Sequence, residues 1–95
     1  MNYSAEITPK AQSDFDAAYD WLVERTPQHA PEWYNGFLDA MLSLESNPAR
    51  CPVDNPKLGT RYLLFGNKRH AYRMIFTIRE STVYILHIRH AARRD

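Results

Sequence analysis

Cysteine, glycine and long apolar runs are scarce in this chain of 95 residues, and each scarcity excludes a class of protein. The single cysteine, Cys51, cannot form a disulfide within the chain, so nothing favours an oxidising compartment and we expect a cytoplasmic protein. Three glycines are too few for a phosphate-binding glycine loop. The four histidines and Cys51 lack the spacing of a zinc motif. We therefore predict no metal site and no cofactor.

The sequence also shows no pattern typical of a membrane-spanning helix or a signal peptide. No apolar run approaches the roughly 20 residues of a membrane-spanning helix. The opening MNYSAEITPK lacks the charged and then apolar pattern of a signal peptide. We expect neither export nor membrane insertion.

The composition is that of one folded domain covering residues 1–95, with 44% hydrophobic, 13% aromatic and 24% charged residues. The net charge of +1 hides a division along the chain. Residues 1–60 carry nine acidic and four basic side chains, whereas residues 61–95 carry two acidic and eight basic ones, seven of them arginines. The basic charge is therefore concentrated in the second half.

The first half has the periodicity of a short strand followed by two helices. Tyr3, Ala5 and Ile7 alternate with polar residues, which predicts a strand with one buried face. Thr8-Pro9 is typical of a helix start, with Thr8 as the N-cap, and the helix should end near Arg25. Its apolar stripe consists of Ala11, Phe15, Ala18 and Leu22.

A second helix is expected to begin at either Thr26-Pro27 or Ala30-Pro31 and to end by Asn47-Pro48. Its stripe consists of Trp33, Phe37, Ala40, Met41 and Leu44. The short joint between the helices favours an antiparallel helical hairpin. Residues 47–60, which are rich in proline, are predicted to form an irregular connection.

The second half has the pattern of three strands, over residues 61–65, 71–79 and 82–88. Gly66-Asn67 and Glu80-Ser81 are turn signals, so an antiparallel meander is expected. Strand alternation places Tyr72, Met74 and Phe76 on one face and Arg73 on the other. The predicted fold class is α+β, with an N-terminal strand and a two-helix hairpin packed on an antiparallel sheet of about four strands.

Arg73 is the most informative single position, because a guanidinium among apolar strand neighbours needs a partner. One interpretation places it on a sheet face that the helices leave uncovered. The other makes it an anion-binding arginine, whose planar fork suits phosphate oxygens. Aromatic side chains in these strands could stack on bases, although such residues more often pack in a core: Tyr62, Phe65, Tyr72 and Tyr84.

The last strand ends in a dense group of histidines and arginines, His87-Ile88-Arg89-His90-Ala91-Ala92-Arg93-Arg94. Histidine can act as a general acid or base near neutral pH, and arginine can stabilise a charged transition state, so this mixture could cleave RNA without a metal. The alternative is a basic chain end in which His87 is buried and hydrogen-bonded within the sheet.

In order and spacing, the chain resembles the RelE/ParE toxin superfamily of bacterial type II toxin–antitoxin systems. The resemblance is carried by YSAEITPKAQSDFDAAYDWL, LESNPARCP, RYLLFG, HAYRMIFTI and VYILHIRHAARRD, which together span nearly the whole chain. It implies two N-terminal helices packed on an antiparallel sheet, and a toxin held inactive by a cognate antitoxin in a hetero-oligomer.

The superfamily carries two activities, and the resemblance assigns residues to each. A RelE-like ribosome-dependent mRNA endoribonuclease would use Arg73, His90 and Arg93 in catalysis. However, RYLLFGN supplies no lysine or carboxylate before Lys68 as the usual base, a role left to His87 or His90. A ParE-like poison of DNA gyrase would use its arginines as a target-binding surface: Arg61, Arg69, Arg73, Arg89, Arg93 and Arg94.

The closing His90-Ala91-Ala92-Arg93 is similar to the His-Gly-Ala-Arg ending of ParE-like chains, so the ParE-like branch is favoured. A third interpretation is a non-toxic module that keeps only the antitoxin-binding fold.

Overall fold

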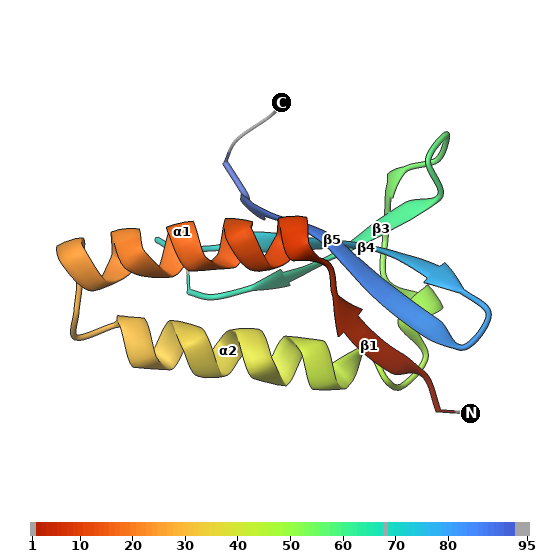
Figure 1. The fold of residues 1–95 in the computed structure, drawn as a ribbon, viewed down its shortest axis with the longest axis horizontal. Coiled ribbons are helices and arrows are strands. Elements are labelled where there is room, and N and C mark those ends of the chain that lie inside the picture. The colour runs from red at the N-terminus through yellow and green to blue at the C-terminus, as the bar shows by residue number, and fades with distance from the viewer. Residues whose placement is uncertain (1, 68, 93–95) are drawn as a thin grey trace.

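The computed structural model describes residues 2–67 and 69–92, in which two helices lie side by side over one face of a sheet (Figure 1). The elements run in the order β1 (Ser4–Ile7), α1 (Pro9–Arg25), α2 (Ala30–Ser43), a 3-10 turn (Pro48–Arg50), β2 (Val53–Asn55), β3 (Thr60–Phe65), β4 (Tyr72–Arg79) and β5 (Thr82–His90). The predicted α+β class is thus confirmed.

The described sheet has five strands in the order β1-β5-β4-β3-β2. β3, β4 and β5 form the expected antiparallel meander, while β1 pairs in parallel with β5, so the sheet is mixed. β2 lies within the stretch expected to be irregular, and it pairs Val53 with Arg61 and Asn55 with Thr60. Three residues are too few to show a period of two, which is why sequence reasoning missed this strand.

Thr8 joins the first helix to the sheet. Its Oγ1 accepts a hydrogen bond from the backbone N–H of Ala11 at 3.3 Å and donates to the carbonyl oxygen of Ile85 at 2.7 Å. The Thr8 N–H donates to the same carbonyl at 3.0 Å. Thr8 is therefore the predicted N-cap, and it also fixes the start of α1 to β5.

The core lies between the helices and one face of the sheet, which we call the inner face. The helices contribute buried Phe15, Leu22, Trp33, Phe37 and Leu44, and the sheet contributes buried Met74, Phe76, Val83, Ile85 and Ile88. Met74 and Phe76 are 0% exposed, as the alternation in β4 predicted. The opposite side of the sheet, here the outer face, carries Arg73, Ile75, Thr77 and Arg79, and the helices do not cover it.

The second helix begins at Ala30, with Pro31 in its first turn, so the later of the two sequence signals is the one that is used. Among the described residues, no helix combines the length and apolar character needed to cross a membrane.

Candidate target-binding face

A β-bulge shapes the outer face. Phe76 pairs with Ile85 but Ile75 pairs with His87, so Leu86 is an extra residue in β5. The bulge lets Leu86 and His87 line the same hollow although they are adjacent in sequence. Without it, strand alternation would send one of them to the inner face.

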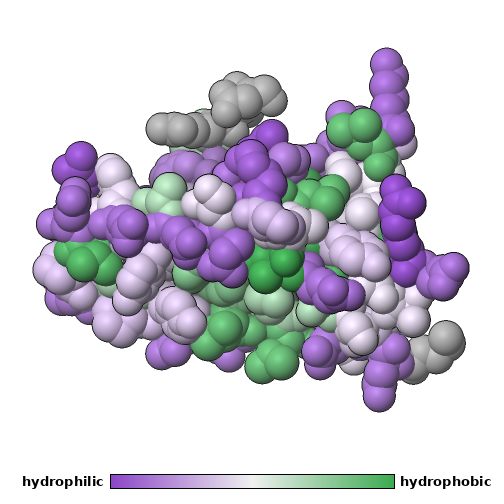
Figure 2. All heavy atoms as spheres, in the orientation of Figure 1, coloured by the Kyte–Doolittle hydropathy of each residue, from purple (hydrophilic) through white to green (hydrophobic). Residues whose placement is uncertain are grey.

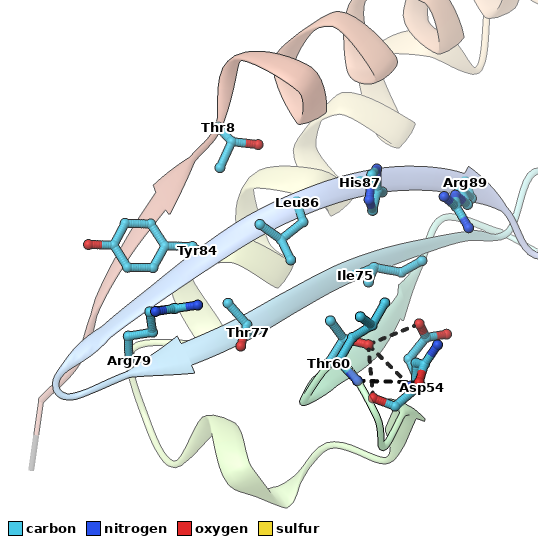
Figure 3. A pocket seen from close by; sticks show the side chains of 12 residues that line it. Thr8, Asp54, Thr60, Ile75, Thr77, Arg79, Tyr84, Leu86, His87 and Arg89 are labelled. Atoms are coloured by element: carbon cyan, nitrogen blue, oxygen red, sulfur yellow. Dashed lines mark hydrogen bonds between the residues drawn. The ribbon is translucent and has the colours of Figure 1, made fainter.

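The hollow encloses about 710 Å³ on the outer face (Figure 3). Ile75 and Leu86 supply apolar surface, and Arg79 and Arg89 lie toward its two ends. The hydroxyl-bearing residues that line it are Thr8, Thr60, Thr77 and Tyr84, and the lining is completed by Asp54, Asn55, Leu58 and His87. A concave surface with cations and an apolar floor is suited to an anionic ligand that also has apolar parts.

Two arginines face each other across neighbouring strands beside this hollow. Arg73 in β4 is directly opposite Arg89 in β5. Like charges placed opposite each other in a sheet destabilise it. Neither side chain forms a salt bridge within the described residues. The register therefore places two arginines at neighbouring positions of the sheet, and neither is paired with a carboxylate within the described residues.

Arg73 is held in place by packing rather than by ion pairing. Its guanidinium carbon lies 4.6 Å from the centroid of the Tyr62 ring, in a cation–π contact. Its Nε is buried and has no hydrogen-bond partner. A buried donor without an acceptor is unfavourable, so the position of the Arg73 Nε carries an energetic cost in the fold.

The other residues proposed for target binding are not all on this face. Arg61 is paired with Phe76 and therefore lies on the inner face of the sheet. Its guanidinium donates a hydrogen bond to the carbonyl oxygen of Cys51 at 2.6 Å. Arg69 lies in the β3–β4 loop, where its N–H donates to Asn67 Oδ1 at 3.0 Å. Arg93 and Arg94 lie outside the described residues. The fold thus brings Arg73 and Arg89 together, and it separates Arg61 from them.

His90 occupies the inner side of the sheet, away from Arg73. It is paired with Tyr72, its ring packs edge-on against the Tyr72 ring at 5.1 Å between centroids, and its Nδ1 accepts from the Ala92 N–H at 3.1 Å. Strand alternation explains the separation, because Arg73 and Tyr72 are adjacent and point to opposite faces. The assignment of Arg73, His90 and Arg93 to catalysis stays a prediction, and this geometry does not favour it.

His87 is the histidine that shares the outer face with Arg73. Burial lowers the pKa of His87 below its ordinary 6.5, and the positive charge of Arg89 lowers this pKa further. Its Nδ1 lies 3.9 Å from Asp14 Oδ2, too far for a hydrogen bond, and that oxygen accepts the Ile88 N–H at 3.1 Å instead. The imidazole is therefore neutral at neutral pH and available as a proton acceptor.

A family model for the ParE toxin of the type II toxin–antitoxin system parDE matches residues 5–95. The chain belongs to the ParE toxin family. Its fold is similar to that of a solved structure titled as the chromosomal ParDE TA system from P. aeruginosa, with a TM-score of 0.76 and 23% identity over 93% of this chain and 95% of that one. No match is found among curated proteins.

The helical side of this ParE-family chain has a different character from the outer face. Tyr34, Leu38 and Leu42 of α2 are 40%, 41% and 63% exposed. Their spacing of four places them along one side of the helix, and we call them the α2 stripe. Figure 2 shows apolar side chains gathered on this side of the molecule, over and between the helices. Exposed apolar surface of this kind is typical of a protein-binding site.

Sequence reasoning singled out four strand aromatics without separating their roles. Phe65 and Tyr72 are buried in the core, whereas Tyr62 contacts Arg73 and Tyr84 lines the hollow. Strand alternation was the signal that could have separated Tyr62 from Phe65. The bulge that aligns Tyr84, Leu86 and His87 has no comparable signal.

No group of three potential metal ligands occurs among the described residues.

Proposed function

We propose that this chain is a growth-inhibiting toxin that acts in the cytoplasm by poisoning DNA gyrase and is held inactive by a cognate antitoxin. Membership of the ParE toxin family supports the toxin role. The observation that carries the proposal is the Arg73–Arg89 pair on the uncovered outer face, two positive charges without a described counterion. A surface of this kind is suited to binding a target.

On the β3 side, the residues next to Arg73 favour a binding role over acid–base catalysis. The outer-face positions of β3 beside it are Thr60, Tyr62 and Leu64, as the register with β4 requires. None of them is a lysine or a carboxylate that could transfer a proton. His90, the histidine nearest the chain end, packs on the inner side.

Gyrase assays test the target directly. Purified toxin should inhibit supercoiling by purified gyrase and should cause cleaved DNA to accumulate, while mRNA on translating ribosomes stays intact. Growth without the antitoxin should stop. Codon-positioned mRNA cleavage with gyrase unaffected would contradict the proposal, and normal growth with abundant soluble protein would exclude a toxin altogether.

The site is tested by removing one guanidinium at a time. Arg73→Ala should lose growth inhibition while the protein remains folded and bound to its antitoxin. Arg25→Ala is the matched control, because Arg25 ends α1 in the helical layer, where its guanidinium lies 4.8 Å from the Trp21 ring. If Arg73→Ala retains its toxicity, Arg73 does not bind the target and is only a structural residue on an uncovered sheet face.

A ribosome-dependent endoribonuclease is the second candidate, because His87 and Arg73 share the outer face. Arg73 is opposite Arg89, two residues along β5 from His87, which makes the pair diagonal neighbours at roughly 7–8 Å between backbone positions. His87→Gln would abolish mRNA cleavage under this mechanism, and His90→Gln would not. Equal effects of both substitutions would argue against it.

The antitoxin is proposed to cover the helical side. The α2 stripe offers an apolar row for an amphipathic segment, and acidic groups of the same partner would complement the basic end of the sheet. A toxin–antitoxin hetero-oligomer is the expected form of the protein. The adjacent reading frame is the first place to look for the partner.

A further inference from the structure

We propose that the hollow, together with the β2–β3 turn at residues 56–59, docks an extended protein segment of the target that has apolar residues in its middle and a carboxylate near each end. This docking role rests on the proposed function, because it concerns the toxin's target. It adds that the part of the target seated here is protein rather than DNA. Three features carry the inference: an exposed leucine on a hydrogen-bonded turn, an arginine toward each end of the hollow, and an apolar floor between them.

The exposed leucine is Leu58. Its side chain lines the hollow and is 71% exposed, the largest fraction among the large apolar residues that the structure describes. The turn that carries it is held by hydrogen bonds, since Asn55 Oδ1 accepts the N–H of Lys57 at 2.9 Å. The carbonyl oxygen of Gly59 accepts from Thr77 Oγ1 in β4 at 3.0 Å. A partner can cover an apolar side chain on such a fixed support without the cost of ordering a loop, so Leu58 is suited to be an anchor.

The two arginines that line the hollow, Arg79 and Arg89, lie toward its opposite ends (Figure 3). Neither forms a salt bridge within the described residues. Arg89 is paired with Arg73, so six residues of β4 separate the two positions, which is roughly 20 Å along an extended strand. An extended peptide of about seven residues covers this length, and a carboxylate near each of its ends would meet one guanidinium.

The middle of the hollow is unsuited to a polyanion. Ile75 and Leu86 form apolar floor, and Asp54 adds a carboxylate on the β2 side. A nucleic-acid strand carries a negative charge at every nucleotide, so the phosphates between the two arginines would lie over apolar surface and beside this carboxylate. A peptide with carboxylates only near its ends avoids both costs, because its middle can be apolar.

The threonine hydroxyls of the hollow already donate within the chain. Thr8 Oγ1 donates to the carbonyl oxygen of Ile85 at 2.7 Å, and Thr60 Oγ1 donates to Asp54 Oδ2 at 3.2 Å (Figure 3). Thr77 Oγ1 donates to the turn, as described above. Since a hydroxyl has one hydrogen to donate, the charged donors left to select a ligand are the two guanidiniums.

The test measures growth inhibition in cells and the binding of purified gyrase subunits to the full-length toxin without DNA. Leu58→Ser should weaken subunit binding about tenfold or more and should lose growth inhibition, because it removes an apolar anchor. Leu64→Ser is the matched control, since Leu64 is 54% exposed on the same sheet face and does not line the hollow. It should change binding little. Both variants should keep the thermal midpoint and the antitoxin affinity of the wild type.

The charge and shape of the docked segment are tested separately. Arg79→Gln should weaken subunit binding about fivefold or more and reduce its dependence on salt, whereas Arg25→Gln in the helical layer should not. An array of overlapping 12-residue peptides from the gyrase subunits locates the segment. Peptides that bind the wild type and not Leu58→Ser should carry acidic residues about six positions apart around an apolar one.

Several outcomes would overturn the proposal. Equal binding by Leu58→Ser and the wild type, or an equal loss in Leu64→Ser, would show that the hollow does not hold the target. Binding that requires DNA would make nucleic acid the ligand. Array peptides that keep their affinity after Glu and Asp are replaced by Gln and Asn would exclude an acidic segment. Loss of antitoxin binding in Leu58→Ser with growth inhibition intact would make the antitoxin the occupant.

Failure of the gyrase proposal is seen independently, because the wild-type toxin would then neither bind nor inhibit gyrase. Growth inhibition still decides the docking role in that case. A toxic Leu58→Ser would overturn it, and a loss confined to Leu58→Ser, with Leu64→Ser still toxic, would support docking of a different protein target in the same hollow.

Discussion

Replacing Gly66 by alanine should severely destabilise the fold, because this glycine directly follows β3 at the start of the connection to β4. Gly66 has φ +93°, a backbone conformation that residues with a side chain rarely adopt. An added Cβ would overlap the carbonyl oxygen of His70 and would lie 3.1 Å from Cδ1 and from Nε1 of Trp33. Neither neighbour can move freely, since one is backbone and Trp33 is a core residue that is only 2% exposed.

We expect Gly66→Ala to lower the free energy of unfolding by about 3 kcal/mol or more, combining backbone strain with displacement of packed atoms. For a domain of this size that corresponds to a fall in the thermal midpoint of roughly 12–24 °C. Differential scanning calorimetry or denaturation followed by circular dichroism measures it. The expression level of soluble protein is the reserve measurement if the variant does not fold.

Gly59→Ala is the matched control. Gly59 also has positive φ, +68°, but an added Cβ there meets nothing within 4 Å. The loss should be limited to the left-handed backbone penalty of about 1 kcal/mol. Replacing Gly36, inside α2, by alanine should raise the free energy of unfolding by about 0.5–1 kcal/mol, because alanine favours a helix more than glycine does. The added Cβ fits there, since it would make an ordinary contact with the Gly66 nitrogen at 3.9 Å. Equal losses at Gly66 and Gly59 would refute the steric part of the argument.

Three further predictions concern the helix start, the half-buried His87 and the α2 stripe. Thr8→Ala should lower the free energy of unfolding by about 2 kcal/mol, the sum of a lost N-cap and a lost bond to Ile85, and Thr8→Ser should recover most of it in the same denaturation experiment. Because the pKa of His87 is lowered in the folded chain, the unfolded chain binds more protons just below pH 6.5. The free energy of unfolding should therefore fall as the pH drops from 6.5, and His87→Gln should flatten that part of the plot of stability against pH. The charges acting on this imidazole are Arg89, Asp14, Lys10 and Asp54. Leu42→Glu should weaken antitoxin binding about tenfold or more in a titration while growth inhibition persists, and an unchanged affinity would place the antitoxin elsewhere.

Local pattern was enough for much of the fold. Thr8-Pro9 marks the start of the first helix, because a capping side chain and a proline act on the residues next to them. For the second helix the pattern left two starts open, and the structure uses Ala30-Pro31. Strand alternation alone placed Arg73 opposite the core, since successive side chains in a strand point to opposite faces. The strand β2 escaped prediction because its three residues are specified by pairing with β3 and not by their own pattern.

The composition of the candidate site was decided by tertiary structure. The sequence concentrates seven arginines in residues 61–95, yet only pairing registers determine that Arg73 meets Arg89 and that Arg61 turns to Cys51. The bulge at Leu86 reverses the expected direction of the following side chains, which brings His87 to the outer face and leaves His90 on the inner one. The sequence by itself thus determined the fold class and which residue types are present. Which of them act together depended on strand register, a property of two distant segments that neither one encodes alone.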